Sequence, residues 1–310
     1  MARFVVRAAF VSFGPEYLPL PRKLPGFGLF RIVCGGTKMW RELAAAFLSL
    51  FCITSRLNAA TTQQFTITKD PQAIAIAAKA IAAMGGAQAL LTYQDSVSTG
   101  TLTLHRAKSV TSHPVTFKSK GTQETRAEFQ MPTGTSLRIV NQGRGIFQNE
   151  DGTIRNLQQN NTYAERVNHI PLLSGLSEYQ GGSVQVQYQG TALVNNQVND
   201  VIAISYVPTT DPLQAAAYVE MTQSLFFVNQ TTALVDKIQY TNFAENDVSV
   251  KDNVEVYFSE YKNVGAISVP FIEAIFVNGN LDAEIVLQSV AFNAGLSDAE
   301  FALPKAINAQ

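Results

Sequence analysis

The sequence predicts a mainly β protein of the α+β class, with antiparallel strands and a few short helices. From Tyr93 onward, short segments rich in Val, Ile, Thr, Phe and Tyr alternate with turns rich in Asn, Gly, Asp and Pro. Pairs such as Gln142-Gly143 and Asn278-Gly279 tolerate positive φ and therefore favour tight turns between strands. Thirteen strands are predicted, at 97–104, 114–120, 125–130, 136–141, 144–149, 153–158, 184–193, 198–207, 223–229, 234–242, 253–261, 267–277 and 283–293.

One amphipathic helix is predicted before the first strand. The Asp70 side chain can cap free backbone amides at the start of a helix, and Pro71 fits its first turn. Gly85 and Gly86 then stop the run. The apolar residues that recur at helical spacing between these signals are Ile74, Ala77, Ile81 and Met84.

The segment from Asn161 to Tyr179 interrupts the series of strands. Its apolar residues recur every third position, and Pro171 breaks or kinks the middle, so we predict one or two short helices. No Pro/Ser-rich linker or charge block divides the chain after residue 60. Residues 61–310 are therefore predicted to form a single domain.

The last strand, 283–293, carries apolar residues at both odd and even positions. Strict alternation places Ile285 and Leu287 on one side and Val286, Val290 and Phe292 on the other. A strand that is apolar on both faces is expected to be covered on both.

Residues 39–60 have the layout of a secretory signal peptide. A basic start at Arg41 precedes a stretch in which ten of the eleven residues from Leu43 to Ile53 are apolar, and small residues follow. That stretch is shorter than the roughly 20 residues that span a bilayer. We predict export to the periplasm with cleavage near Ala60, the alternative being a buried helix of the domain.

Residues 1–38 fit neither a signal peptide nor the fold that follows. Four prolines between Pro15 and Pro25 break any long helix. We interpret this part as a non-native N-terminal extension that begins at an upstream start codon.

The charge of the mature part differs from that of the whole chain. The whole chain has 23 Lys+Arg and 24 Asp+Glu, a net charge of −1, but residues 1–60 hold 8 basic and 2 acidic residues. Residues 61–310 therefore carry a net charge of −7, which argues against nucleic acid as a partner. Cys34, Cys52 and the one tryptophan, Trp40, all precede residue 61, so the mature part has no disulfide or thiol site.

No catalytic motif occurs in the sequence: there is no G-x-S-x-G, no H-E-x-x-H and no P-loop. His105 and His113 could meet across a turn as a metal pair, but without cysteine or a tight His-x-His spacing they fit surface histidines better. Glu255 and Glu260 could supply acid and base chemistry, although charges on strands usually face solvent. We therefore predict neither an enzyme nor a cofactor nor a metal site.

The C-terminal part, from Val254 to Pro304, resembles the end of outer-membrane lipoprotein carrier domains of the LolA type. It has a strand with the same Tyr, Val and Pro spacing, an Asn-Gly hairpin and a final Phe-Asn and Phe-Pro pattern. Residues 120–153 resemble the paired strands of the same family. The matching C-terminal residues are Tyr261, Val264, Pro270, Asn278, Gly279, Phe292, Asn293, Phe301 and Pro304.

This resemblance implies an incomplete antiparallel β-barrel whose concave face is covered by short helices, with an apolar cavity between the sheet and a lid. The lid would be residues 161–179 together with the helix that starts at Asp70. Arg126 matches a basic residue of the family and is expected to hold the lid closed by donating hydrogen bonds to its carbonyls. The expected ligand contacts, for which ordinary core packing is the alternative, are Ile170, Leu172, Leu173 and Leu176 on the lid, facing Phe129, Leu137, Ile139 and Phe147 on the sheet.

The same resemblance favours a soluble periplasmic binding protein or carrier, acting as a monomer, that holds a lipid or the acyl chain of a lipoprotein. Its partners would be the lipid or acylated protein and membrane-bound donor and acceptor proteins. Two alternatives remain open. One is an envelope assembly component that binds a partner through a sheet edge, and the other is an unrecognised envelope hydrolase.

Overall fold

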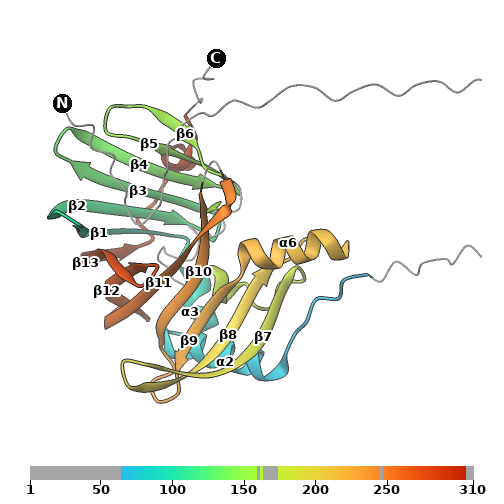
Figure 1. Cartoon of the computed structure of the whole chain (residues 1–310). Coiled ribbons are helices and arrows are strands. Elements are labelled where there is room, and N and C mark those ends of the chain that lie inside the picture. The colour runs from blue at the N-terminus through green and yellow to red at the C-terminus, as the bar shows by residue number, and fades with distance from the viewer. Residues whose placement is uncertain (1–63, 159–160, 163–173, 245–246, 305–310) are drawn as a thin grey trace, which may run out of the picture. The chain divides into compact units, whose positions relative to one another are not determined.

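The computed structural model describes residues 64–158, 161–162, 174–244 and 247–304. Thirteen strands in these ranges form one sheet in which all neighbouring strands are antiparallel (Figure 1). The strands are β1 (Asp95–Arg106), β2 (Ser109–Lys120), β3 (Glu124–Met131), β4 (Gly134–Asn141), β5 (Arg144–Gln148), β6 (Ile154–Asn156), β7 (Val184–Val194), β8 (Gln197–Tyr206), β9 (Ser224–Asn229), β10 (Val235–Ala244), β11 (Asp247–Val264), β12 (Ile267–Val277) and β13 (Asn280–Phe292).

The order of the strands divides the sheet into two meanders. Consecutive strands pair from β1 to β6 and again from β7 to β13, and the two meanders join where β1 pairs with β13. Within the described part of the chain, no pairing connects β6 with β7, so the sheet is not closed into a barrel. The predicted fold class, an incomplete barrel of antiparallel strands with short helices, is confirmed.

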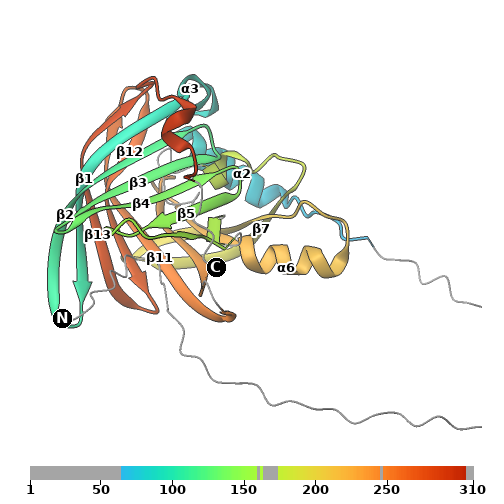
Figure 2. The same ribbon diagram turned by 90° about the horizontal axis from the view of Figure 1, so that it is seen from above.

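Short helical elements accompany the sheet in the described part of the chain, where Asn161 and Thr162 are also helical. Helix α2 contacts β7, β8 and α5, and helix α6 contacts β8 and β10. Figure 2 shows the sheet curving, with α2 inside the curve. The elements are α2 (Pro71–Ala83), α3 (Ala87–Thr92), α5 (Ser174–Ser177), α6 (Pro212–Thr222) and the 3-10 helix η1 (Asp298–Phe301).

The main hydrophobic core lies on one face of the sheet, which we call the inner face. It joins the buried side of α2 to side chains from both meanders, such as Leu102 of β1, Phe226 of β9 and Ile285 of β13. The opposite face of the sheet is the outer face. Because α2 packs on the inner face, the predicted covering of the sheet by a helix is confirmed for this element.

Helix α2 begins where the sequence predicts. The carboxylate of Asp70 accepts hydrogen bonds from the backbone N–H groups of Gln72 and Ala73, at 2.8 and 3.3 Å, and Pro71 is the first helical residue. The chain leaves the helix through Gly85 and Gly86, both with positive φ. Local capping chemistry therefore accounts for where this helix begins and ends.

Helix α6 has no counterpart in the prediction. Its cap, Asp211, accepts hydrogen bonds from the N–H groups of Leu213 and Gln214 at 2.9 and 3.0 Å, and Pro212 follows it. The helix buries only Ala215 along its length, so it lacks the apolar periodicity that revealed α2. Asp211-Pro212 repeats the Asp70-Pro71 pair that begins α2, and this pair predicts where α6 begins.

The expectation that β13 is apolar on both faces is wrong, because the strand contains a β-bulge. Ser289 lies opposite Thr99, whereas Leu287 lies opposite the next residue of β1, Gly100, so Gln288 is the extra residue. The extra residue shifts the alternation by one. Val290 and Phe292 therefore join Ile285 and Leu287 against the main core, and only Val286 points outward, 40% exposed.

Several predicted segments lie outside the described residues. They include the N-terminal extension, the signal peptide and residues 163–173 of the predicted helical insertion. The end of that insertion is described and contains α5.

Candidate functional site

The alternation of side chains along β3 and β4 divides the predicted ligand contacts between the two faces of the sheet. Residues directly opposite each other in an antiparallel pair point to the same face. Phe129 lies opposite Ser136, and Arg126 lies opposite Ile139, an odd number of residues away, so the two pairs point to opposite faces. The predicted residues thus fall into two sets, Phe129 and Phe147 on the inner face and Arg126, Leu137 and Ile139 on the outer face.

The two inner-face phenylalanines belong to different apolar clusters. Phe129 is part of the main core, where its ring meets that of Phe117 edge-on with the centroids 6.3 Å apart. Phe147 packs with Val140 and Leu157 in a smaller cluster. The guanidinium of Arg155 lies 4.7 Å above the Phe147 ring, so this second cluster has a cationic border.

Leu176 is the predicted lid residue that the structure describes. It is fully buried and belongs to the main core, together with Tyr179 and Phe226. Ile170, Leu172 and Leu173 lie outside the described residues. The role of these four residues as ligand contacts stays a prediction.

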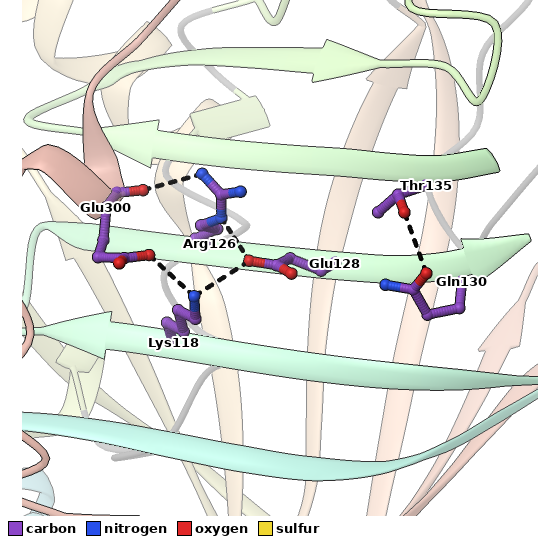
Figure 3. Close-up of polar contacts among 6 residues, drawn as sticks. All are labelled: Lys118, Arg126, Glu128, Gln130, Thr135 and Glu300. Atoms are coloured by element: carbon purple, nitrogen blue, oxygen red, sulfur yellow. Dashed lines mark hydrogen bonds and ion pairs between the residues drawn. The ribbon is translucent and has the colours of Figure 1, made fainter.

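Arg126 belongs to a polar cluster on the outer face (Figure 3). Its Nε donates a hydrogen bond to Glu128 Oε1 at 2.6 Å, and its Nη1 donates to the backbone carbonyl of Glu300 at 3.1 Å. Lys118 Nζ donates to Glu300 Oε2 at 2.8 Å and lies 3.2 Å from Glu128 Oε1. Farther along the same face, Thr135 Oγ1 donates to Gln130 Oε1 at 3.0 Å.

This cluster fastens the C-terminal turn to the sheet. The helix η1 packs against β3 and β4, and Asn141 Nδ2 donates to the carbonyl of Phe301 at 3.2 Å. The Phe301 side chain is fully buried. The backbone carbonyl that Arg126 binds therefore belongs to the C-terminal segment, not to the predicted lid.

The charges in the cluster reinforce one another. The hydrogen bond from Lys118 lowers the pKa of the Glu300 carboxyl, and the same contact raises the pKa of Lys118. Because Glu300 is partly exposed, solvent screens the pair and its contribution to stability is modest. The outer-face cluster is thus a structural clamp.

The two histidines considered as a metal pair lie on different faces. His113 is opposite Leu102 on the inner face, and His105, three residues after Leu102 in β1, points outward. Within the described part of the chain, no group of three His, Cys, Asp or Glu side chains is arranged to hold a metal ion.

Glu273 is a buried carboxylic acid that the sequence prediction missed. It lies on the inner face of β12, in phase with Phe271 and Ile275, and is 4% exposed. Burial raises the pKa of its carboxyl to about 8. The sequence contains a signal for this position. Glu273 alternates with apolar residues along the strand, so its side chain is expected to share their buried face. The carboxylates that were considered, Glu255 and Glu260, are partly or fully exposed.

Solved structures with a similar fold come from bacteria. A domain assigned to outer membrane lipoprotein sorting from Vibrio parahaemolyticus matches at 14% identity, covering 74% of this chain and 96% of that one, with a TM-score of 0.48. A DUF1329 family protein from Desulfovibrio piger matches at 15% identity, over 74% and 97%, with a TM-score of 0.49. A LolA superfamily protein from Nitrosomonas europaea matches at 11% identity, over 77% and 99%, with a TM-score of 0.47.

These likenesses are to a fold of the predicted type, and at such identities and TM-scores they carry no function to this chain. No protein-family model matches the sequence, and no curated protein matches it. None of the helices in the described ranges has the length and apolar character needed to cross a membrane. Function is therefore argued from the chain's own residues.

Proposed function

We propose that this protein is a soluble binding protein of the periplasm that holds a lipid, or the acyl chain of a lipoprotein, against the inner face of its sheet. The ligand would be carried between membrane-bound donor and acceptor proteins. In this proposal the protein binds and releases its ligand and catalyses no reaction.

The observation that supports this function is the continuity of the apolar inner face. A single cluster of buried apolar side chains runs across strands of both meanders and onto α2. Its border contains apolar side chains that are only partly buried, among them Phe117, Met131, Tyr188 and Val290. An open sheet with such a surface can exchange side-chain contacts for contacts with an acyl chain.

The hydrophobic effect supplies the affinity in this proposal. Each methylene group of an acyl chain that leaves water contributes about 0.8 kcal/mol. The neutral to acidic composition of the mature part gives no electrostatic attraction to a phosphate headgroup, so the chain rather than the headgroup would be recognised.

The proposal assigns ligand contact to the inner-face members of the predicted set. These are Phe129 and Phe147, with Leu176 of the main core. Ile170, Leu172 and Leu173, which lie outside the described residues, are kept as predicted contacts. Leu137 and Ile139 point to the outer face with Arg126. They stabilise the sheet under the C-terminal turn in this proposal and do not meet the ligand.

Native mass spectrometry of protein purified from the cell envelope tests the proposal directly. We expect a co-purifying lipid or acylated peptide, and we expect the delipidated protein to bind a fluorescent long-chain acyl probe. A protein that carries no lipid and binds no probe is not a carrier, and one of the alternative functions would then apply.

A matched pair of variants locates the binding surface. Met131→Ala shortens a partly buried side chain on the inner face and is expected to weaken probe binding. Val286→Ala shortens an apolar side chain that is 40% exposed on the outer face and is expected to leave binding unchanged. Equal effects of the two substitutions would place the probe elsewhere.

The predicted export and cleavage are tested by the tryptophan fluorescence of the exported protein. Cleavage near Ala60 removes Trp40, the one tryptophan, so the mature protein is expected to show no indole fluorescence. Tryptophan emission from protein in the periplasmic fraction would exclude this processing.

A further inference from the structure

The buried acid Glu273 occupies a position that every neighbour along the strand fills with an apolar side chain. The inner-face series of β12 contains Ile267, Val269, Phe271, Ile275 and Val277, all of which pack in or against the main core. Glu273 falls between Phe271 and Ile275 in that series and is 4% exposed.

The strands on either side of β12 also present apolar side chains to Glu273. Phe258 of β11 lies directly opposite on one side, and Ile285 of β13 lies opposite on the other. Both are buried at 5% exposure and belong to the main core. The carboxyl group is therefore bordered by apolar residues in the four nearest positions of the sheet.

Within the described part of the chain, the Glu273 side chain forms no hydrogen bond or ion pair. Tyr261 is a titratable neighbour, and its pKa is raised by burial, by Asp236 and by Glu273. Its hydroxyl group donates a hydrogen bond to the carbonyl of Val235 at 2.7 Å and not to Glu273. A buried polar group without a partner lowers stability, and such groups in folded proteins call for an explanation.

A carboxyl group in these surroundings is mostly protonated at neutral pH, because burial disfavours its charged form. Lys262 of β11 shares this face, but its Nζ lies 4.5 Å from the centroid of the Phe271 ring and, within the described residues, forms no ion pair with Glu273. It can then donate one hydrogen bond as a neutral acid. A phosphate or a free carboxylate would bring an unpaired charge into the core, and an amine would form a desolvated ion pair. A neutral acceptor on an otherwise apolar ligand fits this group best.

We propose that Glu273 recognises the carbonyl oxygen of an acyl ester bound at the inner face, donating to it the one polar hydrogen bond in an apolar site. This inference rests on the proposed lipid-binding function and deepens it. It selects esterified acyl chains over both free fatty acids and plain hydrocarbons.

Competition between three ligands of matched length tests the inference. Methyl dodecanoate, tridecanoate and tetradecane, each with about 14 heavy atoms in its main chain, are used to displace a fluorescent alkyl probe from the delipidated protein. The parent protein is expected to bind the ester about fivefold more tightly than the alkane, which is the size of one net hydrogen bond. The free acid is expected to bind most weakly.

Three variants separate the hydrogen bond from the packing. Glu273→Leu is expected to bind ester and alkane equally, and Glu273→Gln is expected to keep the preference because its amide N–H can donate. Glu284→Leu replaces an acid on the outer face of the adjacent strand and is expected to behave as the parent protein. A further readout is pH: the preference should decline above about pH 8 in the parent protein and not in Glu273→Gln.

The outcomes distinguish the two proposals. If none of the three ligands displaces the probe, the lipid-binding function fails. If ester and alkane bind equally to the parent protein, or if Glu273→Leu keeps the ester preference, lipid binding stands and the role assigned to Glu273 is overturned.

Discussion

At the scale of single residues, Glu273 makes stability depend on pH in a direction opposite to that of most carboxylates. Its pKa is about 8 in the folded protein and 4.5 in the reference state. Below pH 4.5 both states are protonated and the group has no effect. As pH rises from 4.5 to 8, only the unfolded state ionises, so the folded state loses stability by about 5 kcal/mol in total.

We therefore predict that Glu273→Gln unfolds at a higher urea midpoint than the parent protein at pH 8, and that the difference narrows toward pH 4.5. The control is Glu255→Gln, which removes an outer-face carboxylate paired with Lys237 at 2.8 Å and should not gain stability at pH 8. If the urea midpoints of Glu273→Gln and the parent protein differ by the same amount at every pH in this range, the Glu273 carboxyl ionises in the folded protein as it does in the unfolded one.

The sequence predicts the alternation of side chains within each strand but not how the faces of neighbouring strands match. Phe129 lies on the inner face in the main core, and its role as a ligand contact stays a prediction. Arg126, Leu137 and Ile139 were expected to share a surface with Phe129, although their register places them on the other face. The sequence of each strand gives its alternation. Which face of β4 continues which face of β3 depends on the pairing register, and the apolar pattern of a single strand does not contain that register.

At the scale of elements, capping explains both the helix that was found and the one that was missed. Asp70 and Asp211 each accept hydrogen bonds from two backbone N–H groups of the helix that follows, and each precedes a proline. We predict that Asp211→Ala lowers the free energy of unfolding by about 1 kcal/mol, the usual value of an N-cap. Urea denaturation measures this loss. Asp211→Asn is the control, because asparagine caps equally well and should preserve stability.

The bulge in β13 gives a second prediction at this scale. Deleting Gln288 removes the extra residue, so either the rest of the strand shifts or Val290 and Phe292 turn outward. We expect a loss of 2 kcal/mol or more, about the cost of exposing one large apolar side chain. The substitution Gln288→Ala keeps the residue count and should change stability by less than about 0.5 kcal/mol. If the deletion is as harmless as the substitution, the bulge does not set the alternation.

The C-terminal turn gives a third prediction at the scale of elements. Phe301 is fully buried on the outer face, so Phe301→Ala is expected to lower the free energy of unfolding by about 3 kcal/mol. Asp298→Asn breaks the exposed ion pair between this turn and Lys120 of β2, and it should change stability little because solvent screens the pair. Thermal unfolding of the two variants compares them. Similar small shifts would mean that η1 detaches without disturbing the sheet.

The strands were predicted almost completely, and their errors have a common cause. The range 114–120 is too short because β2 begins at Ser109, and 253–261 is too short because β11 begins at Asp247. These extra residues are mostly exposed on both sides. They pair with a neighbouring strand without contributing to the core, and the apolar residues among them, Val110, Val248 and Val250, are exposed.

At the scale of the whole molecule, the open antiparallel sheet was predictable and the join between its halves was not. The turn signals gave consecutive hairpins, which describe each meander from β1 to β6 and from β7 to β13. The pairing of β1 with β13 has no local signal, because Thr99 and Ser289, whose hydroxyl oxygens lie 2.7 Å apart, are 190 residues apart in the sequence.

That join has a consequence for the order in which the protein folds. Hairpins within each meander close short loops and can form early, whereas a contact between residues so far apart has a large entropic cost until the rest is in place. A chain emerging from the first residue to the last completes the β1–β13 contact only when its end has appeared. We expect pulsed hydrogen exchange during refolding to protect β3–β4 and β8–β9 before β1–β13, which would make the join the rate-limiting step of folding.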